Sequence, residues 1–327
     1  MTPLRIGVVG VGYLGSIHAR LWNQVAGVEF AGVYDSDPVR AESVAGEHGV
    51  TAFTTLDALL DAVDAVSIAS TTVTHRDVAL AAIERGRGVF IEKPIAASSG
   101  EAEEILGAAE RAGVVVQVGH VERFNPAVMA LRGRQLHPRF IEAHRLAPFR
   151  PRATDVAVVL DLMIHDIDLV LDLVGSYPSD VRANGVSVIS STIDIANARL
   201  EFPDGCVANL TASRISQRPM RKMRLFQQDA YISLDFATPE VEMFRIIDEG
   251  EDVGETTTLL GAIEQGDRAR RIIYERPSVP ALNAIATELE EFAAAVRGER
   301  APAVTGRAAT DALRVAEEIV EMITKGG

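Results

Sequence analysis

Short apolar, β-branched runs alternate with longer amphipathic stretches from residue 4 to about residue 118. Such runs predict buried strands, and apolar residues at helical spacing between them predict covering helices. The predicted strands are Leu4–Val9, Val28–Tyr34, Ala65–Ala69, Gly88–Ile91 and Val114–Val118, with a weaker one at Thr51–Phe53. The helices include Ser16–Trp22, Ala41–His48, Val73–Arg85 and Gly100–Ala112. This alternation is typical of βαβ units, so we expect a doubly wound α/β domain with a parallel sheet.

The rhythm changes after Pro126, where strands follow one another without helices between them. A strand at Phe140–Leu146 and a long apolar helix from about Asp155 to Val174 come first. The later strands are Val181–Ile189, Ile195–Phe202, Cys206–Ser213, Met223–Gln227, Tyr231–Phe236 and Val241–Ile246, and the chain ends in helices Ala284–Val296 and Arg307–Ile323. Turn residues such as Pro203-Asp204-Gly205 favour hairpins, so we expect a large, mostly antiparallel open sheet in an α+β domain.

Composition and charge narrow the function classes. A length of 327 residues is typical of two domains, and 32 Lys+Arg against 46 Asp+Glu give a net charge of −14, which disfavours nucleic acid as a partner. The single Cys206 excludes an intrachain disulfide and a cysteine-rich zinc site. No apolar run reaches the roughly 18 residues of a membrane span, and the first residues do not resemble a secretory signal. We therefore expect a cytoplasmic protein with no membrane contact.

A glycine motif, Gly10-x-Gly12-x-x-Gly15, lies between the first predicted strand and helix. Gly10 permits a sharp turn, Gly12 lets the backbone approach a pyrophosphate, and Gly15 allows close helix packing. Amides at the helix N-terminus would then face the anion. The alternative is a tight turn of the kind found in any α/β protein. The position between a strand and a helix favours dinucleotide binding.

Asp35 ends the second predicted strand, 20 residues after Gly15. A carboxylate there accepts hydrogen bonds from the adenosine ribose and repels a 2′-phosphate, which favours NAD over NADP. The same stretch, through Asp37, is also suited to cap the next helix, and both roles are compatible. Arg40 is close enough in sequence to keep NADP as an alternative.

Lys93 follows a predicted buried strand and precedes Pro94. Open α/β sheets bind ligands beyond the carboxyl ends of their strands, which is where Lys93 would emerge. Pro94 excludes helical geometry for Lys93 and permits a cis peptide bond. The alternative is a solvated loop, because charged residues mostly lie outside the core.

A stripe of polar residues follows the long apolar helix. Its members, Asp161, His165, Asp168 and Asp172, are spaced by 4, 3 and 4 positions and therefore share one face. One interpretation is that this face meets water. The other is that it lines a cleft, where Asp161 orients His165 as a general base. One carboxylate and histidine pair offers too few ligands to favour a metal.

The motifs together resemble the glucose-fructose oxidoreductase, inositol dehydrogenase and rhizopine catabolism (GFO/IDH/MocA) family, over essentially the whole chain. The resemblance runs through Gly10-x-Gly12-x-x-Gly15, Ser70-Thr71-Thr72-x-x-His75, Glu92-Lys93-Pro94, Gly119-His120-Val121-Glu122-Arg123-Phe124-Asn125-Pro126 and Asp161-x-x-x-His165. It implies a Rossmann domain at residues 1–121, followed by a substrate-binding and oligomerisation α+β domain at residues 122–327 whose terminal helices can pack back on the first. A homodimer or homotetramer is implied as well.

The resemblance also implies NAD-dependent hydride transfer from a ring hydroxyl of a sugar or sugar nucleotide. Lys93 would hydrogen-bond the reacting hydroxyl and His165 would take its proton, with Asp161 beside it. The implied cofactor contacts are Gly10, Gly12, Tyr13, Leu14, Gly15, Asp35, Ser70, Thr71, Thr72, His75, Glu92, Lys93 and Gln117. The implied substrate contacts are Arg123, Asn125, Arg152, Asp161 and His165.

The sugar is less closely defined by these motifs. Many polyol-oxidising members carry two arginines where this chain has Glu122-Arg123, and Arg145, Arg150 and Arg152 stand near the presumed cleft. Arginine suits phosphate recognition, although scattered surface arginines are also common. The chain most resembles members that oxidise sugar nucleotides, which implies UDP-N-acetylglucosamine oxidised at C3 and a pathway aminotransferase. The alternatives are a polyol, inositol or free-sugar dehydrogenase, and a non-catalytic NAD-binding regulator.

Overall fold

The computed structural model describes residues 2–150, 156–248, 250–251, 253, 257–265 and 268–326. They form two compact units. The first unit consists of Met1–Val121 with Leu282–Arg314, and the second consists of Glu122–Ala281 with Val315–Gly327. The segment Leu282–Arg314 thus belongs to the first unit although it lies near the end of the chain.

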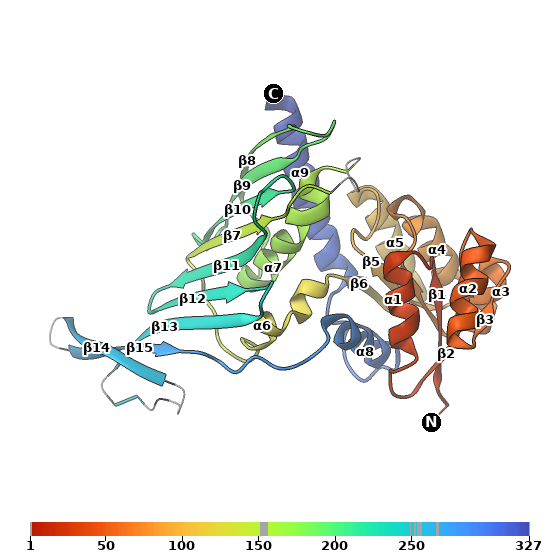
Figure 1. Ribbon diagram of the computed structural model, residues 1–327, viewed down its shortest axis with the longest axis horizontal. Helices are drawn as coiled ribbons and strands as arrows, with labels where there is room; N and C mark the ends of the chain where they lie inside the picture. The colour runs from red at the N-terminus through yellow and green to blue at the C-terminus, as the bar shows by residue number, and fades with distance from the viewer. Residues whose placement is uncertain are drawn as a thin grey trace. The chain divides into compact units, whose positions relative to one another are not determined.

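A parallel sheet forms the centre of the first unit (Figure 1). Its order is β3-β2-β1-β4-β5-β6, and each neighbouring pair is parallel. The bounds are β1 Leu4–Val9, β2 Val28–Tyr34, β3 Thr51–Ala52, β4 Ala65–Ile68, β5 Gly88–Glu92 and β6 Val116–Gly119. The strand order reverses between β1 and β4, and doubly wound sheets bind ligands at the carboxyl edge of such a switch point. The predicted doubly wound fold is confirmed.

Helices cover both faces of this sheet, and several of them begin with a side-chain cap. They are α1 Tyr13–Trp22, α2 Pro38–His48, α3 Leu56–Ala62, the 3-10 helix η1 Thr72–Thr74, α4 His75–Glu84, α5 Ser99–Ala112 and α8 Ala284–Val296. Asp37 caps α2 and Ser98 caps α5, each by accepting hydrogen bonds from backbone amides. Trp22 and Phe90 pack edge-to-face against Phe292 of α8, with ring centroids 6.3 and 5.7 Å apart. These aromatic contacts hold α8 within the first unit.

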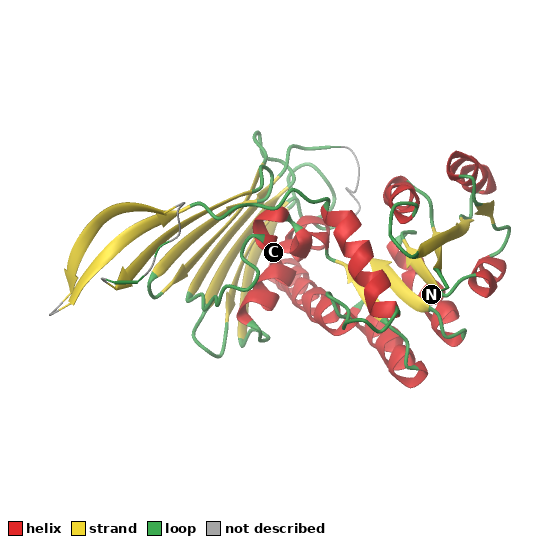
Figure 2. Ribbon diagram, turned by 90° about the horizontal axis from the view of Figure 1, so that it is seen from below, coloured by secondary structure: helices red, strands yellow, loops and turns green. Residues whose placement is uncertain are grey.

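A nine-stranded sheet dominates the described part of the second unit (Figure 2). Its order is β14-β15-β13-β12-β11-β7-β10-β9-β8. The bounds are β7 Phe140–Leu146, β8 Asp180–Val186, β9 Ile195–Glu201, β10 Val207–Ser213, β11 Met220–Gln227, β12 Ala230–Asp235, β13 Glu240–Asp248, β14 Thr257–Gln265 and β15 Arg268–Glu275. Every neighbouring pair is antiparallel except β7 with β10. The expected mostly antiparallel sheet is confirmed, but β14 and β15 were not predicted.

Short helices pack on one face of the nine-stranded sheet. They are the 3-10 helix η2 Val121–Phe124, α6 Pro126–Met129, the π-helix η3 Val159–Met163 and α7 Ile164–Val174. The α7 helix contacts β7 and β10, and α6 contacts β12 and β13. The helix predicted from Asp155 therefore begins at Val159 and opens with a π turn, while Asp155 lies outside the described residues. The last helix, α9 Gly306–Gly326, runs from the first unit into the second. No described helix is long and apolar enough to cross a membrane.

Candidate active site

The glycine loop after β1 is shaped to receive a phosphate group. Gly10 has a φ of +81°, and a Cβ there would lie 2.5 Å from the Cα of Ser70. A Cβ on Gly15 would lie 1.8 Å from the carbonyl oxygen of Gly10, so helix and loop touch at this point. The space beside Gly12 is open to 4 Å, and Gly12 begins α1 without any side-chain cap. The amides of this helix N-terminus are thus suited to an anion.

Asp35 stands at the carboxyl end of β2 and ties it to the glycine loop. It is 8% exposed, one carboxylate oxygen accepts a hydrogen bond from the Val11 amide at 2.8 Å, and the other accepts from the Asp37 amide at 2.9 Å. Arg40 lies nearby, with Nη1 3.5 Å from Asp35 Oδ1. The two backbone amides therefore fix the orientation of the Asp35 carboxylate.

A cavity of about 460 Å³ lies at the switch point between β1 and β4. Five of the predicted cofactor residues line it, namely Gly10, Gly12, Asp35, Ser70 and Thr71, together with Ser36 and Arg40. Its volume lies within the range of roughly 300–1,000 Å³ that is usual for ligand pockets. The open glycine loop, the uncapped helix N-terminus and the fixed carboxylate all fit a dinucleotide.

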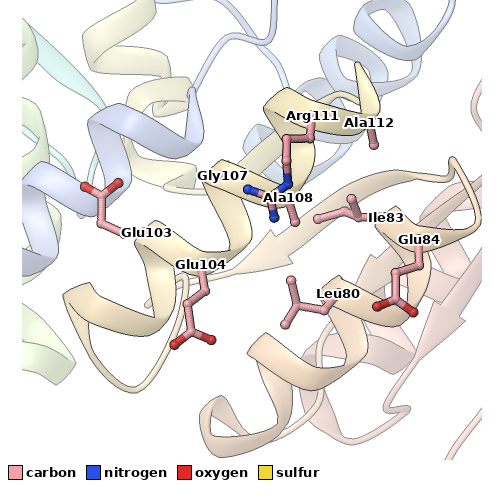
Figure 3. Close-up of a pocket in the computed structure, with 9 residues that line it drawn as sticks. All are labelled: Leu80, Ile83, Glu84, Glu103, Glu104, Gly107, Ala108, Arg111 and Ala112. Carbon is pink, nitrogen blue, oxygen red and sulfur yellow. The ribbon is translucent and has the colours of Figure 1, made fainter.

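A second hollow, of about 640 Å³, lies between α4 and α5 (Figure 3). Leu80 and Ile83 of α4 and Gly107 and Ala108 of α5 line it, with glutamates at its rim. It is a groove on the outer surface of two helices and contains none of the predicted site residues. The cavity at the glycine loop, and not this groove, is therefore the one lined by predicted cofactor residues.

His75 and Gln117 are buried and have structural roles. The His75 ring lies 3.0 Å from the Pro94 carbonyl oxygen through Nδ1 and 3.1 Å from the Ser70 carbonyl oxygen through Nε2. Burial lowers the pKa of His75, although the two carbonyls oppose this effect. Gln117 donates to the Glu288 carbonyl and accepts from the Ala303 amide. His75 thus links two loops and Gln117 joins β6 to α8, and the expected cofactor contacts of both residues stay predictions.

The remaining expected cofactor residues lie at the edges of the glycine loop and of β5. Tyr13 and Leu14, in the first turn of α1, are 76% and 37% exposed and do not line the cavity. Thr72 begins the short helix η1, beside Thr71. Lys93 follows directly after β5, and its peptide bond to Pro94 is cis, as the proline permits. Lys93 thus leaves the sheet at its carboxyl edge, as expected from the sequence.

Asp161 and His165 belong to the second unit, whereas Lys93 belongs to the first. Asp161 lies in the π-helix η3 and His165 in the first turn of α7, and both side chains are partly exposed. Turns of π-helix occur frequently at functional sites. The predicted catalytic residues are thus divided between the two units, and their roles remain predictions.

The other two residues of the polar stripe, Asp168 and Asp172, form ion pairs with Arg123. The guanidinium makes a two-pronged contact with Asp168, both nitrogen to oxygen distances being 2.7 Å, and a third contact with Asp172 at 2.5 Å. Asp168 is completely buried, and burial raises the pKa of Asp172. Arg123 thus joins η2 to α7, and its expected substrate contact stays a prediction.

The Arg145 side chain is buried in the second unit, where two carboxylates contact it. It is 3% exposed, donates to Asp166 at 3.0 and 2.7 Å, and donates to Glu122 at 3.0 Å. The two carboxylates raise the pKa of Arg145 against the effect of burial, which works in the opposite direction. The expectation that Arg145 faces a phosphate is therefore wrong. Two carboxylates already neutralise it in the core.

Asn125 and Arg152 are the other predicted substrate contacts, and Arg150 belongs to the same arginine cluster as Arg152. Asn125 caps α6 by accepting from the Ala127 amide at 3.0 Å, and its amide group donates to the Phe236 carbonyl at 3.2 Å. Its side chain is therefore part of the fold at this turn. Arg150 is exposed, and Arg152 lies outside the described residues.

Known proteins resemble this chain over both units. Residues 4–120 match the oxidoreductase family with an NAD-binding Rossmann fold, and residues 127–233 match the GFO/IDH/MocA C-terminal domain. The UDP-N-acetylglucosamine 3-dehydrogenase of Acidithiobacillus ferrooxidans is 40% identical over 316 residues, which cover 95% of this chain and 99% of that protein. The chain belongs to the GFO/IDH/MocA family of oxidoreductases.

Solved structures and other relatives agree with this family. A structure of the Acidithiobacillus ferrooxidans enzyme matches with a TM-score of 0.88 and 37% identity, over 99% of each chain. The scyllo-inositol 2-dehydrogenase (NAD(+)) of Bacillus subtilis is 30% identical over 232 residues, 65% of this chain and 68% of that protein. The predicted family, the dehydrogenase class and the cofactor NAD are thereby confirmed.

Proposed function

We propose that this oxidoreductase oxidises the C3 hydroxyl of UDP-N-acetylglucosamine with NAD. The observation that carries this proposal is the 40% identity to UDP-N-acetylglucosamine 3-dehydrogenase over nearly the full length of both chains. By contrast, the similarity to Inositol 2-dehydrogenase 2 of Saccharopolyspora erythraea covers 53% of this chain. The 40% identity to the sugar-nucleotide enzyme thus extends through the substrate unit as well as the cofactor unit.

The proposed chemistry needs a base at the hydroxyl proton and a hydrogen-bond donor to the hydroxyl oxygen. Lys93 donates to the oxygen, and His165 accepts the proton with Asp161 beside it. Bound NAD supplies the hydride acceptor. In support, Lys93 emerges at the carboxyl edge of β5, and Asp161 and His165 are the partly exposed half of the stripe that Arg123 does not occupy.

A substrate panel tests the assignment. Purified protein with NAD is mixed with UDP-N-acetylglucosamine, UDP-glucose, free N-acetylglucosamine or myo-inositol, and NADH fluorescence is followed. We expect turnover with the first compound and at least tenfold lower kcat/KM with the others, which lack the acetamido group, the nucleotide or both. Substrate deuterated at C3 should pass its label to NADH, as read by mass spectrometry. Preferred turnover of inositol or a free sugar would refute the substrate and favour the polyol alternative.

The face of the nine-stranded sheet opposite α6 and α7 carries an aromatic row. The five rings lie on adjacent strands with centroids 4.9 to 5.8 Å apart, and each touches the ring directly across from it: Phe140, Phe226, Tyr231, Phe244 and Tyr274. None of them is fully buried within this chain. An apolar surface of this kind favours association, so we propose a homodimer or homotetramer that uses this face.

The cellular setting follows from the same proposal. Oxidation at C3 leaves a ketone, which is the functional group that an aminotransferase converts to an amine, so we propose such an enzyme as the next step. Sugar nucleotides and NAD are both cytoplasmic metabolites, and we place the reaction there. In the same proposal, residues 1–121 bind NAD and residues 122–327 hold the sugar nucleotide and the subunit contacts.

A further inference from the structure

A chain of three polar side chains, two of them buried, leads to the Lys93 turn within the first unit. It consists of Ser67 on β4, His18 on α1 and Glu92 at the end of β5. The Nδ1 atom of His18 lies 2.7 Å from Ser67 Oγ, and its Nε2 atom lies 3.0 Å from Glu92 Oε1. His18 and Ser67 are completely buried, and the Glu92 side chain is 12% exposed.

The partners define where the hydrogen of His18 must lie. An ionised carboxylate only accepts, so the nitrogen that faces Glu92 is the one that carries a hydrogen. The contact is an electrostatic one rather than an in-line hydrogen bond, because Nε2 has no hydrogen-bond partner of good geometry among the described residues. The Ser67 hydroxyl can then donate to Nδ1, which fixes the orientation of the ring.

The surroundings hold the Glu92 carboxylate in one place. Gly119 on β6 pairs with Glu92, and a Cβ at Gly119 would come within 3.0 to 3.1 Å of the carboxylate atoms. The second carboxylate oxygen accepts from the Lys93 amide at 3.3 Å. Phe90 packs edge-on against the His18 ring, with centroids 5.5 Å apart. The Glu92 carboxylate thus fills the space that Gly119 leaves open, between the His18 ring and the Lys93 backbone.

We propose that His18 is a positioning residue of the active site, which acts through Glu92 on the turn that carries Lys93. His18 has no exposed surface and so does not touch the substrate itself. Its Nε2 hydrogen faces the carboxylate at the foot of Lys93, and Ser67 fixes the ring from behind. This inference rests on the proposed role of Lys93 and adds two residues, His18 and Ser67, that no sequence motif above included.

Three substitutions of His18 separate positioning from packing. Gln can place an amide donor near the position of Nε2, Asn reaches only toward Ser67, and Leu keeps the volume without polar atoms. We expect His18→Gln to retain kcat within about threefold, while His18→Asn and His18→Leu lower kcat about 10- to 100-fold, the range for losing an interaction with a charged group. Equal kcat loss in the Gln and Leu variants would overturn the proposal.

Phe90→Leu is the matched control, because it disturbs the packing around His18 but keeps the polar chain. We expect it to lower the melting temperature about as much as His18→Leu and to leave kcat within about threefold. In a Glu92→Ala background, His18→Leu should cause no further loss of kcat. A full additional loss in that background would show that His18 does not act through Glu92.

A readout that needs no turnover distinguishes failure of this inference from failure of the proposed substrate. In protein with ¹⁵N-labelled histidine, the resonances that disappear in His18→Gln belong to His18, and we expect its Nε2 to carry a hydrogen. A ring protonated on Nδ1 alone would overturn the inference. The kinetic comparisons use whichever alcohol the wild type oxidises, so an unreactive UDP-sugar would refute only the substrate.

Discussion

Arg145 holds together the buried charges of the second unit, and its removal gives a quantitative test of that role. The guanidinium contacts Asp166 twice, at 3.0 and 2.7 Å, and Glu122 once, at 3.0 Å. All three residues are less than 10% exposed. Arg145→Met keeps most of the side-chain volume but leaves two carboxylates in the core without a cation.

The magnitude follows from this burial. Removing one partner of a buried ion pair costs about 3–5 kcal/mol, because an uncompensated charge stays in the core. Domains are stable by only about 5–15 kcal/mol, so Arg145→Met should remove a large part of the stability. For a unit of this size, each kcal/mol shifts the melting temperature by roughly 2–4 °C, which predicts a fall of about 10 °C. Urea unfolding followed by far-UV circular dichroism gives the free energy directly.

Arg224→Met is the matched control on the neighbouring strand. Arg224 pairs with Glu142 at 3.3 Å, but the two side chains are 44% and 32% exposed. Exposed pairs contribute about 0–1 kcal/mol, so this variant should unfold nearly as the wild type does. Similar losses in the two variants would refute the view that burial makes the Arg145 network important.

The pH dependence supplies a second test of the same variant. Burial raises the pKa of Asp166, and the nearby Arg145 is the strongest effect that lowers it. Without Arg145, the pKa of Asp166 in the folded protein should rise further above its value in the unfolded chain. Between these two pKa values the folded protein binds more protons than the unfolded chain does. The stability of Arg145→Met relative to wild type should therefore be greatest at a pH below the pKa of Asp166 in the unfolded chain. It should fall as the pH rises through the pKa of Asp166 in the folded variant. A difference that does not depend on pH between about 4 and 8 would refute this assignment.

Three further predictions concern the cofactor, the chemistry and the assembly. Lys93→Ala and His165→Ala should each lower kcat about 10²- to 10⁴-fold while NAD still binds, as measured by calorimetry; unchanged turnover in both would contradict their roles. Asp35→Ser removes the charge that repels a 2′-phosphate and leaves Arg40 beside it, so the ratio of kcat/KM for NADP to that for NAD should rise at least tenfold in steady-state assays. Phe244→Glu places a charge in the aromatic row and should shift the molar mass in light scattering toward the monomer, whereas Phe244→Leu should not.

The elements of the fold differ in how well the sequence predicts them. Leu4–Val9, Val28–Tyr34 and Phe140–Leu146 match the prediction in full, because buried strands require uninterrupted or strictly alternating apolar residues. Helix α3 has only seven residues, which is too short for a helical period to be recognised. Strand β14 is hard to predict because apolar positions such as the 60% exposed Leu259 do not face a core. In β15, Ile273 is buried, but arginines interrupt the apolar pattern along the strand.

The site separates into local and long-range features in the same way. The glycine loop, Asp35 and Lys93 were predictable because the chemistry depends on residues adjacent in the chain. The ion pairs of Arg123 and Arg145 cannot be predicted from local sequence because their partners are distant: Asp168 is 45 positions from Arg123, and Asp166 is 21 from Arg145. Helical spacing indicates that residues share a face but not what that face contacts.

Glu122 changes how the departure from the polyol-oxidising pattern is understood. Where many such members have two arginines, this chain has Glu122 followed by Arg123. The carboxylate of Glu122 is 7% exposed and contacts the buried Arg145 at 3.0 Å. A second arginine at this position would bring two cations together in the core, which is strongly unfavourable. Glu122 is therefore explained by the charge balance around Arg145, and the choice of a sugar nucleotide rests on the full-length similarity instead.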